Sequence, residues 1–133
     1  MRDHVYLDSS ALVKLVVFEP ESAALREFLK GHAARLSSGL AEVEVPRALR
    51  RAGYGAAEQR RAVGLLARIA LVDVDRAILR AAAAIAPTNL QSLDAIHLAT
   101  ALSLGQDLAG IITYDQRLAE AAISADLEVW APT

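Results

Sequence analysis

Two acidic residues follow apolar, partly β-branched runs that are typical of buried strands. Asp8 comes directly after Val5-Tyr6-Leu7, and Asp115 stands two positions beyond Ile111-Ile112-Thr113. In an open parallel sheet the functional crevice lies beyond the carboxyl ends of the strands, so acids placed there share one rim. We therefore expect the Asp8 and Asp115 carboxylates to lie close together although they are far apart in the chain.

A third acid, Asp94, stands in the first turn of an expected helix that is otherwise mostly apolar. The helix dipole also favours an acid in this turn, so a purely structural role for Asp94 stays open. Glu42 and Glu44 are two residues apart in another expected helix, which places them about 200° apart around its axis. Only one can face a site, and we assign Glu44 because it shares the apolar side of the helix.

Four carboxylates on one rim repel one another, and a divalent cation makes their proximity tolerable. The chain has no cysteine and only three histidines, so oxygen ligands are expected. Oxygen ligands favour Mg²⁺ or Mn²⁺, and Mg²⁺ in proteins commonly pairs with substrate phosphates. The expected chemistry is phosphoryl transfer assisted by one or two ions, with Asp8, Glu44, Asp94 and Asp115 as the site residues.

Composition and charge limit the class of protein. The 133 residues are 54% hydrophobic, which fits a single domain over residues 1–133 that buries its own core. Lys14 interrupts the apolar run 11–18, and the opening Met1-Arg2-Asp3-His4 is polar, so we expect neither a signal peptide nor a membrane span, and a cytoplasmic location. The net charge of −2 argues against a general nucleic-acid-coating protein.

The charge is nevertheless uneven. Six of the twelve arginines fall between positions 47 and 68 against the single acid Glu58, which leaves a local surplus of +5. We favour two solvated helix faces as the explanation; the alternative is a patch that holds a phosphate backbone, since the arginine fork suits bidentate contact. In that alternative the RNA-binding candidates are Arg47, Arg50 and Arg51.

Secondary-structure elements must position the four site residues. The periodicity of apolar residues predicts strands alternating with helices. Strands are expected at 4–7, 34–37, 71–74, 110–113 and 127–130. Helices are expected at 11–18, 22–30, 39–52, 56–70, 76–86, 92–104 and 116–124, with Pro46 kinking the third unless it begins later. The residues Ser9, Ser10 and Ser92 are candidate helix caps. This order predicts an α/β fold with a parallel sheet covered on both faces.

Four sequence blocks together resemble the PIN-domain family, and within it the VapC-type toxins of bacterial and archaeal toxin–antitoxin pairs. Residues 5–14 resemble the family's opening strand and first acid, and residues 44–51 its glutamate helix. Residues 93–101 resemble the third-acid helix, and residues 113–118 the fourth-acid turn. The match spans nearly the whole chain, with the blocks in the family's order and near-usual spacing. Two departures are Glu42, beside the usual glutamate, and Asp126, where a glycine is common.

The resemblance implies a PIN-like three-layer α/β/α sandwich, with a central, mostly parallel sheet of about five strands. It also implies Mg²⁺- or Mn²⁺-dependent endoribonuclease activity on RNA phosphodiester bonds, a homodimer, and inhibition by a small cognate VapB-type antitoxin. Carried over by position, Asp8, Asp94 and Asp115 would bind the principal metal, and Glu44 would orient water or help hold a second ion. Ser9 and Thr113 would hydrogen-bond to these ligands.

Several residues invite a functional interpretation that we do not favour. His97 lies three residues after Asp94 and could reach the same side, but a histidine on an apolar helix is more often packed and hydrogen-bonded. Tyr114 and Trp130 could stack on bases, although core or dimer packing is the simpler interpretation. A partner could cover apolar side chains expected on the surface, namely Val16, Phe18 and Leu65.

Three alternatives were weighed against a nuclease. A phosphate-receiver domain needs an acid pair after the first strand and a lysine after the last, yet the only lysines are Lys14 and Lys30. A haloacid-type phosphatase needs a second aspartate where Ser10 stands. The serious alternative is a catalytically silent PIN-like protein-binding module, whose acid cluster receives an arginine from a partner.

Overall fold

A computed structural model describes residues 2–133, so Met1, the first residue of the opening segment, lies outside the described residues. Its centre is a five-stranded sheet in the order β3-β2-β1-β4-β5, in which every neighbouring pair of strands is parallel. The strands are β1 (His4–Leu7), β2 (Ala34–Ser38), β3 (Ala70–Val72), β4 (Leu108–Ile112) and β5 (Val129–Trp130). The predicted parallel α/β fold is therefore confirmed.

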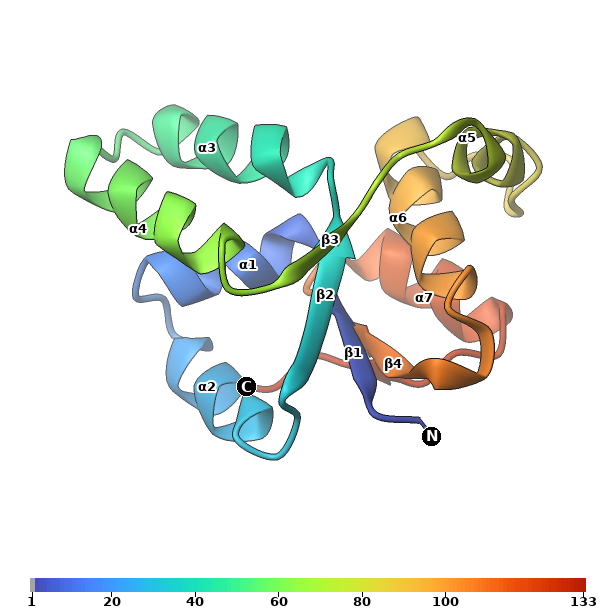
Figure 1. The fold of residues 1–133 in the computed structure, drawn as a ribbon, viewed down its shortest axis with the longest axis horizontal. Coiled ribbons are helices and arrows are strands. Elements are labelled where there is room, and N and C mark those ends of the chain that lie inside the picture. The colour runs from blue at the N-terminus through green and yellow to red at the C-terminus, as the bar shows by residue number, and fades with distance from the viewer. Residues whose placement is uncertain (1) are drawn as a thin grey trace.

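Helices cover both faces of the sheet, as Figure 1 shows. One side carries α1 (Ser9–Val16), α2 (Ser22–Leu29), α3 (Ala41–Arg51) and α4 (Ala56–Leu66). The other side carries α5 (Arg76–Ala83), α6 (Ser92–Leu102) and α7 (Gln116–Ser124), with α5 packed on α6. A short 3₁₀ turn, Gly105–Asp107, leads into β4. The layers form the predicted α/β/α sandwich, and α3 packs against α4.

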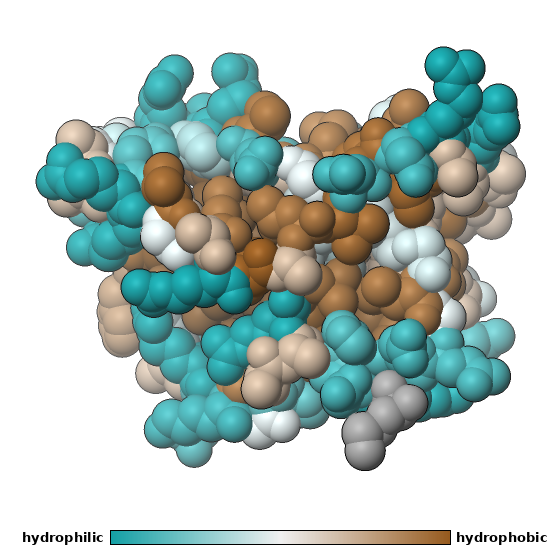
Figure 2. Space-filling model, in the orientation of Figure 1, coloured by the Kyte–Doolittle hydropathy of each residue, from teal (hydrophilic) through white to brown (hydrophobic). Residues whose placement is uncertain are grey.

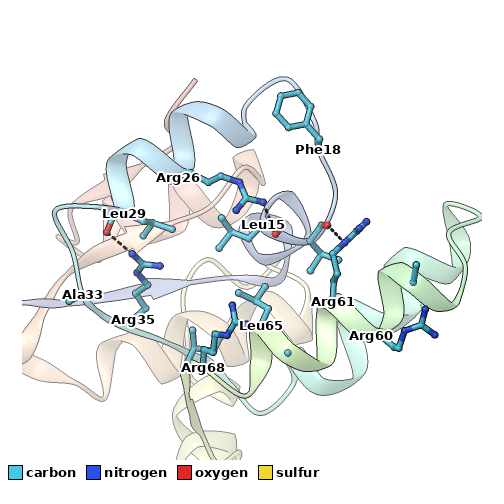
Figure 3. A pocket seen from close by; sticks show the side chains of 14 residues that line it. Leu15, Phe18, Arg26, Leu29, Ala33, Arg35, Arg60, Arg61, Leu65 and Arg68 are labelled. Atoms are coloured by element: carbon cyan, nitrogen blue, oxygen red, sulfur yellow. Dashed lines mark hydrogen bonds between the residues drawn. The ribbon is translucent and has the colours of Figure 1, made fainter.

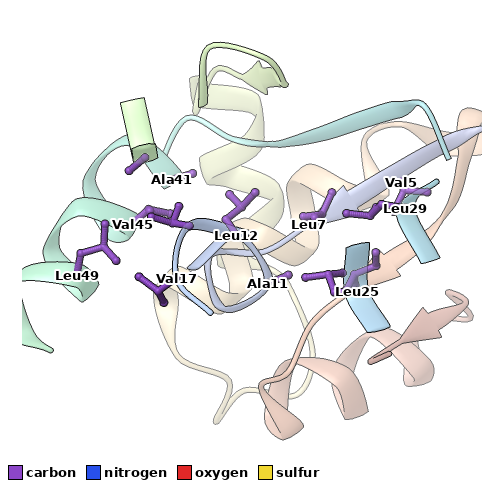
Figure 4. Close-up of a cluster of buried hydrophobic side chains, with 13 residues drawn as sticks. Val5, Leu7, Ala11, Leu12, Val17, Leu25, Leu29, Ala41, Val45 and Leu49 are labelled. Carbon is purple, nitrogen blue, oxygen red and sulfur yellow. The ribbon is translucent and has the colours of Figure 1, made fainter. Parts of the chain in front are cut away.

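The central strand β1 contributes to two separate cores because successive side chains of a strand point to opposite faces. Val5 and Leu7 enter the core under α1 to α4, which Figure 4 shows with Leu12 and Leu25 nearby. Tyr6 enters the core under α6 and α7. Full burial of a Leu or Ile side chain contributes about 1.5–3 kcal/mol, so these two cores hold the sheet between its helical layers.

Strand pairing fixes the place where the first helix begins. β1 pairs with β4 so that Leu7 lies opposite Ile112, and the Asp8 N–H donates to the Ile112 carbonyl at 3.2 Å. Helix α1 starts at the next residue, with the Asp8 side chain as its N-cap through the Ala11 N–H. The capping hydroxyls predicted at Ser9 and Ser10 are therefore wrong, because the aspartate itself occupies the cap position.

Several predicted boundaries also differ from the structure. β3 ends at Val72 rather than at residue 74, and β5 begins at Val129 rather than at residue 127. Both are edge strands, where pairing on one side only leaves the terminal residues outside the ladder. Pro46 lies inside α3, which begins at Ala41 instead of residue 39. Gln91 rather than Ser92 occupies the cap position of α6, without a side-chain cap bond.

The surface separates apolar from charged regions. In Figure 2 apolar side chains gather over the middle of the face that carries β2 and β3, and hydrophilic side chains border them above and below. Phe18 is 80% exposed and Leu65 is partly buried, but Val16 is buried in the core, so its predicted exposure is wrong. Within residues 2–133, no helix combines the length and the apolar character needed to cross a membrane.

Candidate active site

The four predicted acids line one pocket of about 480 Å³ at the carboxyl ends of β1 and β4. The apolar rim includes Val43 and Leu93, both exposed. The polar lining comes from α1 with its cap, α3, the start of α6 and the cap of α7, and comprises Asp8, Ser9, Ser10, Glu44, Arg47, Arg51, Gln91, Asp94, His97 and Asp115. The expectation that distant acids converge on one rim is thus confirmed.

Asp8 is the most enclosed of the four acids, at 4% exposure. Its Oδ1 accepts hydrogen bonds from the Ser10 hydroxyl at 2.6 Å and from the Ala11 N–H at 3.0 Å. Its Oδ2 accepts the Thr113 hydroxyl at 2.5 Å. Burial raises the pKa of Asp8 above its ordinary value, and these hydrogen bonds only partly oppose that effect. Burial disfavours the charged form of this carboxylate, yet the hydrogen bonds hold it in place, as expected of an active-site acid.

Glu44 is held by two donors on a single oxygen. Its Oε1 accepts the Ser9 hydroxyl at 2.7 Å and lies 2.6 Å from His97 Nε2. Partial burial alone would raise the pKa of Glu44, but the hydrogen bond from His97, helped by that from Ser9, brings the pKa below its ordinary value. Glu42 is exposed and lies outside the pocket lining, so the assignment of Glu44 as the inward-facing glutamate is confirmed.

The pKa of Asp94 reflects the negative charges of the other three acids. Burial is the main cause that raises the pKa of Asp94, followed by the negative charge of Asp115 and, more weakly, those of Asp8 and Glu44. Asp115 also caps α7, accepting the Leu118 N–H at 3.0 Å. The acids are therefore close enough to repel one another, which is the condition under which a bound cation becomes favourable.

The carboxylates are not arranged as a ready coordination shell. Across residues 2–133, no three His, Asp or Glu side chains stand together in an arrangement that could hold a metal ion. The oxygens of Asp8 and the Oε1 of Glu44 instead accept protein hydrogen bonds. The donor set nevertheless fits a hard cation, because four mutually repelling carboxylates line one polar pocket.

Four neighbouring side chains test the sequence predictions. Ser9 contacts Glu44 and Thr113 contacts Asp8, the acids they were predicted to support. Ser10, predicted to be a simple cap, donates to Asp8 and also accepts the Tyr114 N–H at 3.0 Å. His97 is packed and hydrogen-bonded as predicted, and it also reaches Glu44, a contact that the sequence did not predict. Its three-residue spacing from Asp94 was the available signal.

A family model described as "PIN domain" matches residues 5–124 of the chain. The chain belongs to the PIN-domain family. Three relatives from Mycobacterium tuberculosis place this PIN domain in the VapC type. Ribonuclease VapC46 is 48% identical over 97% of this chain and 98% of its own length. Ribonuclease VapC35 is 44% identical over 96% of each chain, and ribonuclease VapC47 is 36% identical over 86% of each.

Solved structures share the architecture of this PIN domain at lower sequence identity. Mycobacterium tuberculosis VapC20, described as a sarcin-ricin loop cleaving toxin, has a TM-score of 0.75 at 14% identity, covering 96% of this chain and 99% of that one. A toxin–antitoxin complex from Klebsiella pneumoniae gives a TM-score of 0.71 at 22% identity, with 97% and 98% coverage. At these identities the likeness shows the fold alone.

The arginines line two separate surfaces of the PIN domain. Arg47 and Arg51 line the acidic pocket, whereas Arg50, predicted with them, does not. A second groove of about 1120 Å³ lies between α2, α4 and the C-terminal end of α1. Figure 3 shows its arginines around Leu15 and Leu65. The arginines that line this groove are Arg26, Arg35, Arg60, Arg61 and Arg68, and no acidic side chain is among its lining residues.

The two aromatic residues that could stack on bases, Tyr114 and Trp130, are partly buried and pack against the core. Trp130 lies against Phe28 and His32, with ring centroids 5.1 Å and 5.8 Å away. A Cβ on Gly110 would stand 2.5 Å from the Trp130 ring, so the indole requires glycine at that position. The Tyr114 hydroxyl donates to the Pro132 carbonyl at 2.8 Å. Core packing, the favoured interpretation, is confirmed for both.

Proposed function

We propose that this PIN domain is a Mg²⁺-dependent endoribonuclease, able to use Mn²⁺, which hydrolyses RNA phosphodiester bonds as the cytoplasmic toxin of a VapBC-type toxin–antitoxin pair. The observation that carries the proposal is the convergence of Asp8, Glu44, Asp94 and Asp115 on one pocket, together with their mutual repulsion. The names of the relatives support it, because each of the three is called a ribonuclease and each matches most of the chain.

In this proposal Asp8, Asp94 and Asp115 would hold the ion. When bound, Mg²⁺ supplies a water of lowered pKa and neutralises the charge that develops on the phosphate. Glu44 is placed to accept a hydrogen bond from the attacking water. Thr113 and Ser10 keep the Asp8 carboxylate fixed, and Ser9 does so for Glu44. With these roles the protein acts mainly by positioning the reacting groups. Positioning provides much of the rate gain in phosphoryl transfer.

Arginines beside the pocket would hold the RNA backbone. Arg47 and Arg51 lie in the pocket lining on α3, next to Glu44, and both are exposed. Their guanidinium groups can each take two phosphate oxygens, which would orient the scissile phosphate toward the acids. Arg50 is not among the lining residues and is the weaker candidate of the three predicted.

The arginine-rich groove is the surface that would receive the cognate antitoxin. Its floor contains Leu15, Leu29 and Leu65, and its rim carries five arginines without an opposing acid in the lining. This combination suits an amphipathic segment with an apolar face and acidic flanks. The homodimer would use a different surface, and the exposed Val43 and Leu93 beside the acidic pocket are candidates for it.

Cleavage of a defined RNA by the wild type and by Asp94→Asn, each with Mg²⁺, Mn²⁺ or EDTA, tests the proposal. We expect cleavage only by the wild type with an ion present. Equal activity in all conditions would remove the nuclease assignment. The alternative, a catalytically silent PIN-like protein-binding module, predicts no cleavage in any condition while the antitoxin still binds.

A further inference from the structure

A chain of buried side chains runs behind the acidic pocket. The Tyr6 hydroxyl lies 2.6 Å from His97 Nδ1, and His97 Nε2 lies 2.6 Å from Glu44 Oε1. Tyr6 is fully buried, and the His97 side chain is 2% exposed. The two rings meet edge-on, with centroids 5.8 Å apart and planes at 74°. The chain crosses β1, α6 and α3, so it links the sheet to the site glutamate.

The chemistry of the three groups favours one direction for both hydrogen bonds. An ionised glutamate only accepts, so His97 Nε2 must carry a proton and donate it to Glu44. A phenol keeps its proton at neutral pH, and an imidazole protonated at Nε2 alone has a lone pair at Nδ1. We therefore assign Tyr6 as the donor to His97 Nδ1, with His97 in the tautomer protonated at Nε2.

This arrangement leaves Glu44 with one bound and one open oxygen. Oε1 accepts both the His97 N–H and the Ser9 hydroxyl, at 2.6 Å and 2.7 Å. Among the described residues no hydrogen bond to Oε2 is formed, and the Glu44 side chain retains 22% exposure in the pocket. Rotation of the carboxylate would break both hydrogen bonds to Oε1, which leaves Oε2 as the oxygen free to accept another donor.

We propose that Tyr6 and His97 are positioning residues of this site: Tyr6 sets the tautomer of His97, and His97 holds Glu44 with its free oxygen toward the attacking water. The predicted effect on catalysis rests on the proposed nuclease function, whereas the hydrogen-bond relay Tyr6–His97–Glu44 itself does not. In this role both residues act through Glu44, although His97 also lines the pocket. Their effect is expected on the rate of the chemical step and not on RNA binding, because they orient a group that acts only during hydrolysis.

The tautomer is tested in the metal-free protein by long-range ¹H–¹⁵N correlation of the imidazoles, with His97→Gln used to assign the signal. We expect Nε2 protonated and Nδ1 unprotonated in the wild type, and loss of this single tautomer in Tyr6→Phe. A doubly protonated ring or an Nδ1-protonated tautomer in the wild type would overturn the relay. This measurement needs no RNA cleavage, so it decides the relay even if the nuclease function fails.

The catalytic consequence is tested by kinetics on a defined RNA. We expect His97→Ala to lower kcat by about 10–100-fold with KM within about twofold, the range for loss of an outer-shell partner. His97→Gln should recover most of the rate, since its amide can both donate to Glu44 and accept from Tyr6. The matched control is Leu98→Ala, fully buried on the same helix but without a pocket contact. Equal kcat losses in His97→Ala and Leu98→Ala would make His97 merely structural.

Discussion

Thr113 donates its hydroxyl proton to Asp8 Oδ2 at 2.5 Å across a sequence separation of 105 residues. The contact exists because β1 and β4 are parallel neighbours whose carboxyl ends stop at the same rim. The Thr113 oxygen also accepts the Asp115 N–H at 3.0 Å. One threonine therefore joins two of the four acids, and the site is built into the strand pairing.

Replacement of Thr113 by valine should destabilise the protein by about 1–3 kcal/mol, because it removes a donor from the buried Asp8 carboxylate without changing side-chain volume. Urea unfolding measures the free-energy change. Thr113→Ser keeps the hydroxyl and serves as the control, with a smaller loss expected. If valine and serine cost the same, the hydrogen bond to Asp8 contributes nothing measurable.

The metal-free protein should lose stability as the pH rises. The pKa values of Asp8 and Asp94 are raised by burial, so between the ordinary and the raised pKa the folded state binds more protons than the unfolded state. Their contribution is therefore present at acid pH and lost as pH increases through the raised pKa. The lowered pKa of Glu44 acts oppositely, adding stability that disappears as pH falls through that lowered value.

Thermal unfolding in EDTA over a pH series measures this dependence. Asp94→Asn should flatten part of the decline, because an amide does not titrate. Added Mg²⁺ should raise Tm most at the higher pH values, where the carboxylates are ionised. A wild-type Tm that climbs steadily with pH in EDTA would contradict the electrostatic description of the pocket.

Asp94→Asn should abolish Mn²⁺ binding while leaving the fold intact. Its removal of one charge relieves repulsion from Asp115, Asp8 and Glu44, so the metal-free variant should be slightly more stable, by less than about 1 kcal/mol because Asp94 is partly solvent-screened. Titration calorimetry with Mn²⁺ and urea unfolding provide the two measurements. Arg47→Ala on the pocket rim is the control, which should keep ion binding. Unchanged Mn²⁺ affinity in Asp94→Asn would exclude Asp94 as a ligand.

Asp126 adopts a left-handed backbone conformation, with φ of 64°. Glycine adopts this conformation without a Cβ clash, so Asp126→Gly should keep or raise stability, by up to about 1 kcal/mol. Asp126→Ala adds the clash without the local hydrogen bonding that aspartate offers, and it should lower stability by about 1 kcal/mol. Denaturant midpoints of the two variants test this prediction. An alanine variant more stable than the wild type would show that the backbone at Asp126 is not strained.

Charge reversal in the arginine-rich groove should separate antitoxin binding from cleavage. The double variant Arg60→Glu with Arg68→Glu is expected to bind the cognate antitoxin with about tenfold or more lower affinity. The salt dependence of association should also be smaller. Neither guanidinium lines the acidic pocket, so RNA cleavage should be unaffected. Arg76→Glu on α5, outside the groove, is the matched control. Antitoxin affinity that is equal in all three proteins would place the antitoxin on another surface.

The sequence alone predicted the parallel α/β fold and the shared rim for local reasons. Apolar runs of strand length alternate with helical periodicity; Asp8 follows such a run directly, and Asp115 follows another after one intervening residue. It also separated Glu44 from Glu42 by helical geometry, which needs only the 3.6-residue repeat. These features depend on spacing along one element, so no tertiary information was required.

Only the tertiary structure decided which side chains hold the acids. Tyr6 and His97 are 91 positions apart and Ser9 and Glu44 are 35 apart, and no local pattern specifies such pairs. The same reason separates the arginines, because Arg51 turns to the acidic pocket while Arg61 turns to the other groove. Spacing within an element determines which face a residue occupies. What that face meets depends on how the elements pack, which is a property of the whole chain.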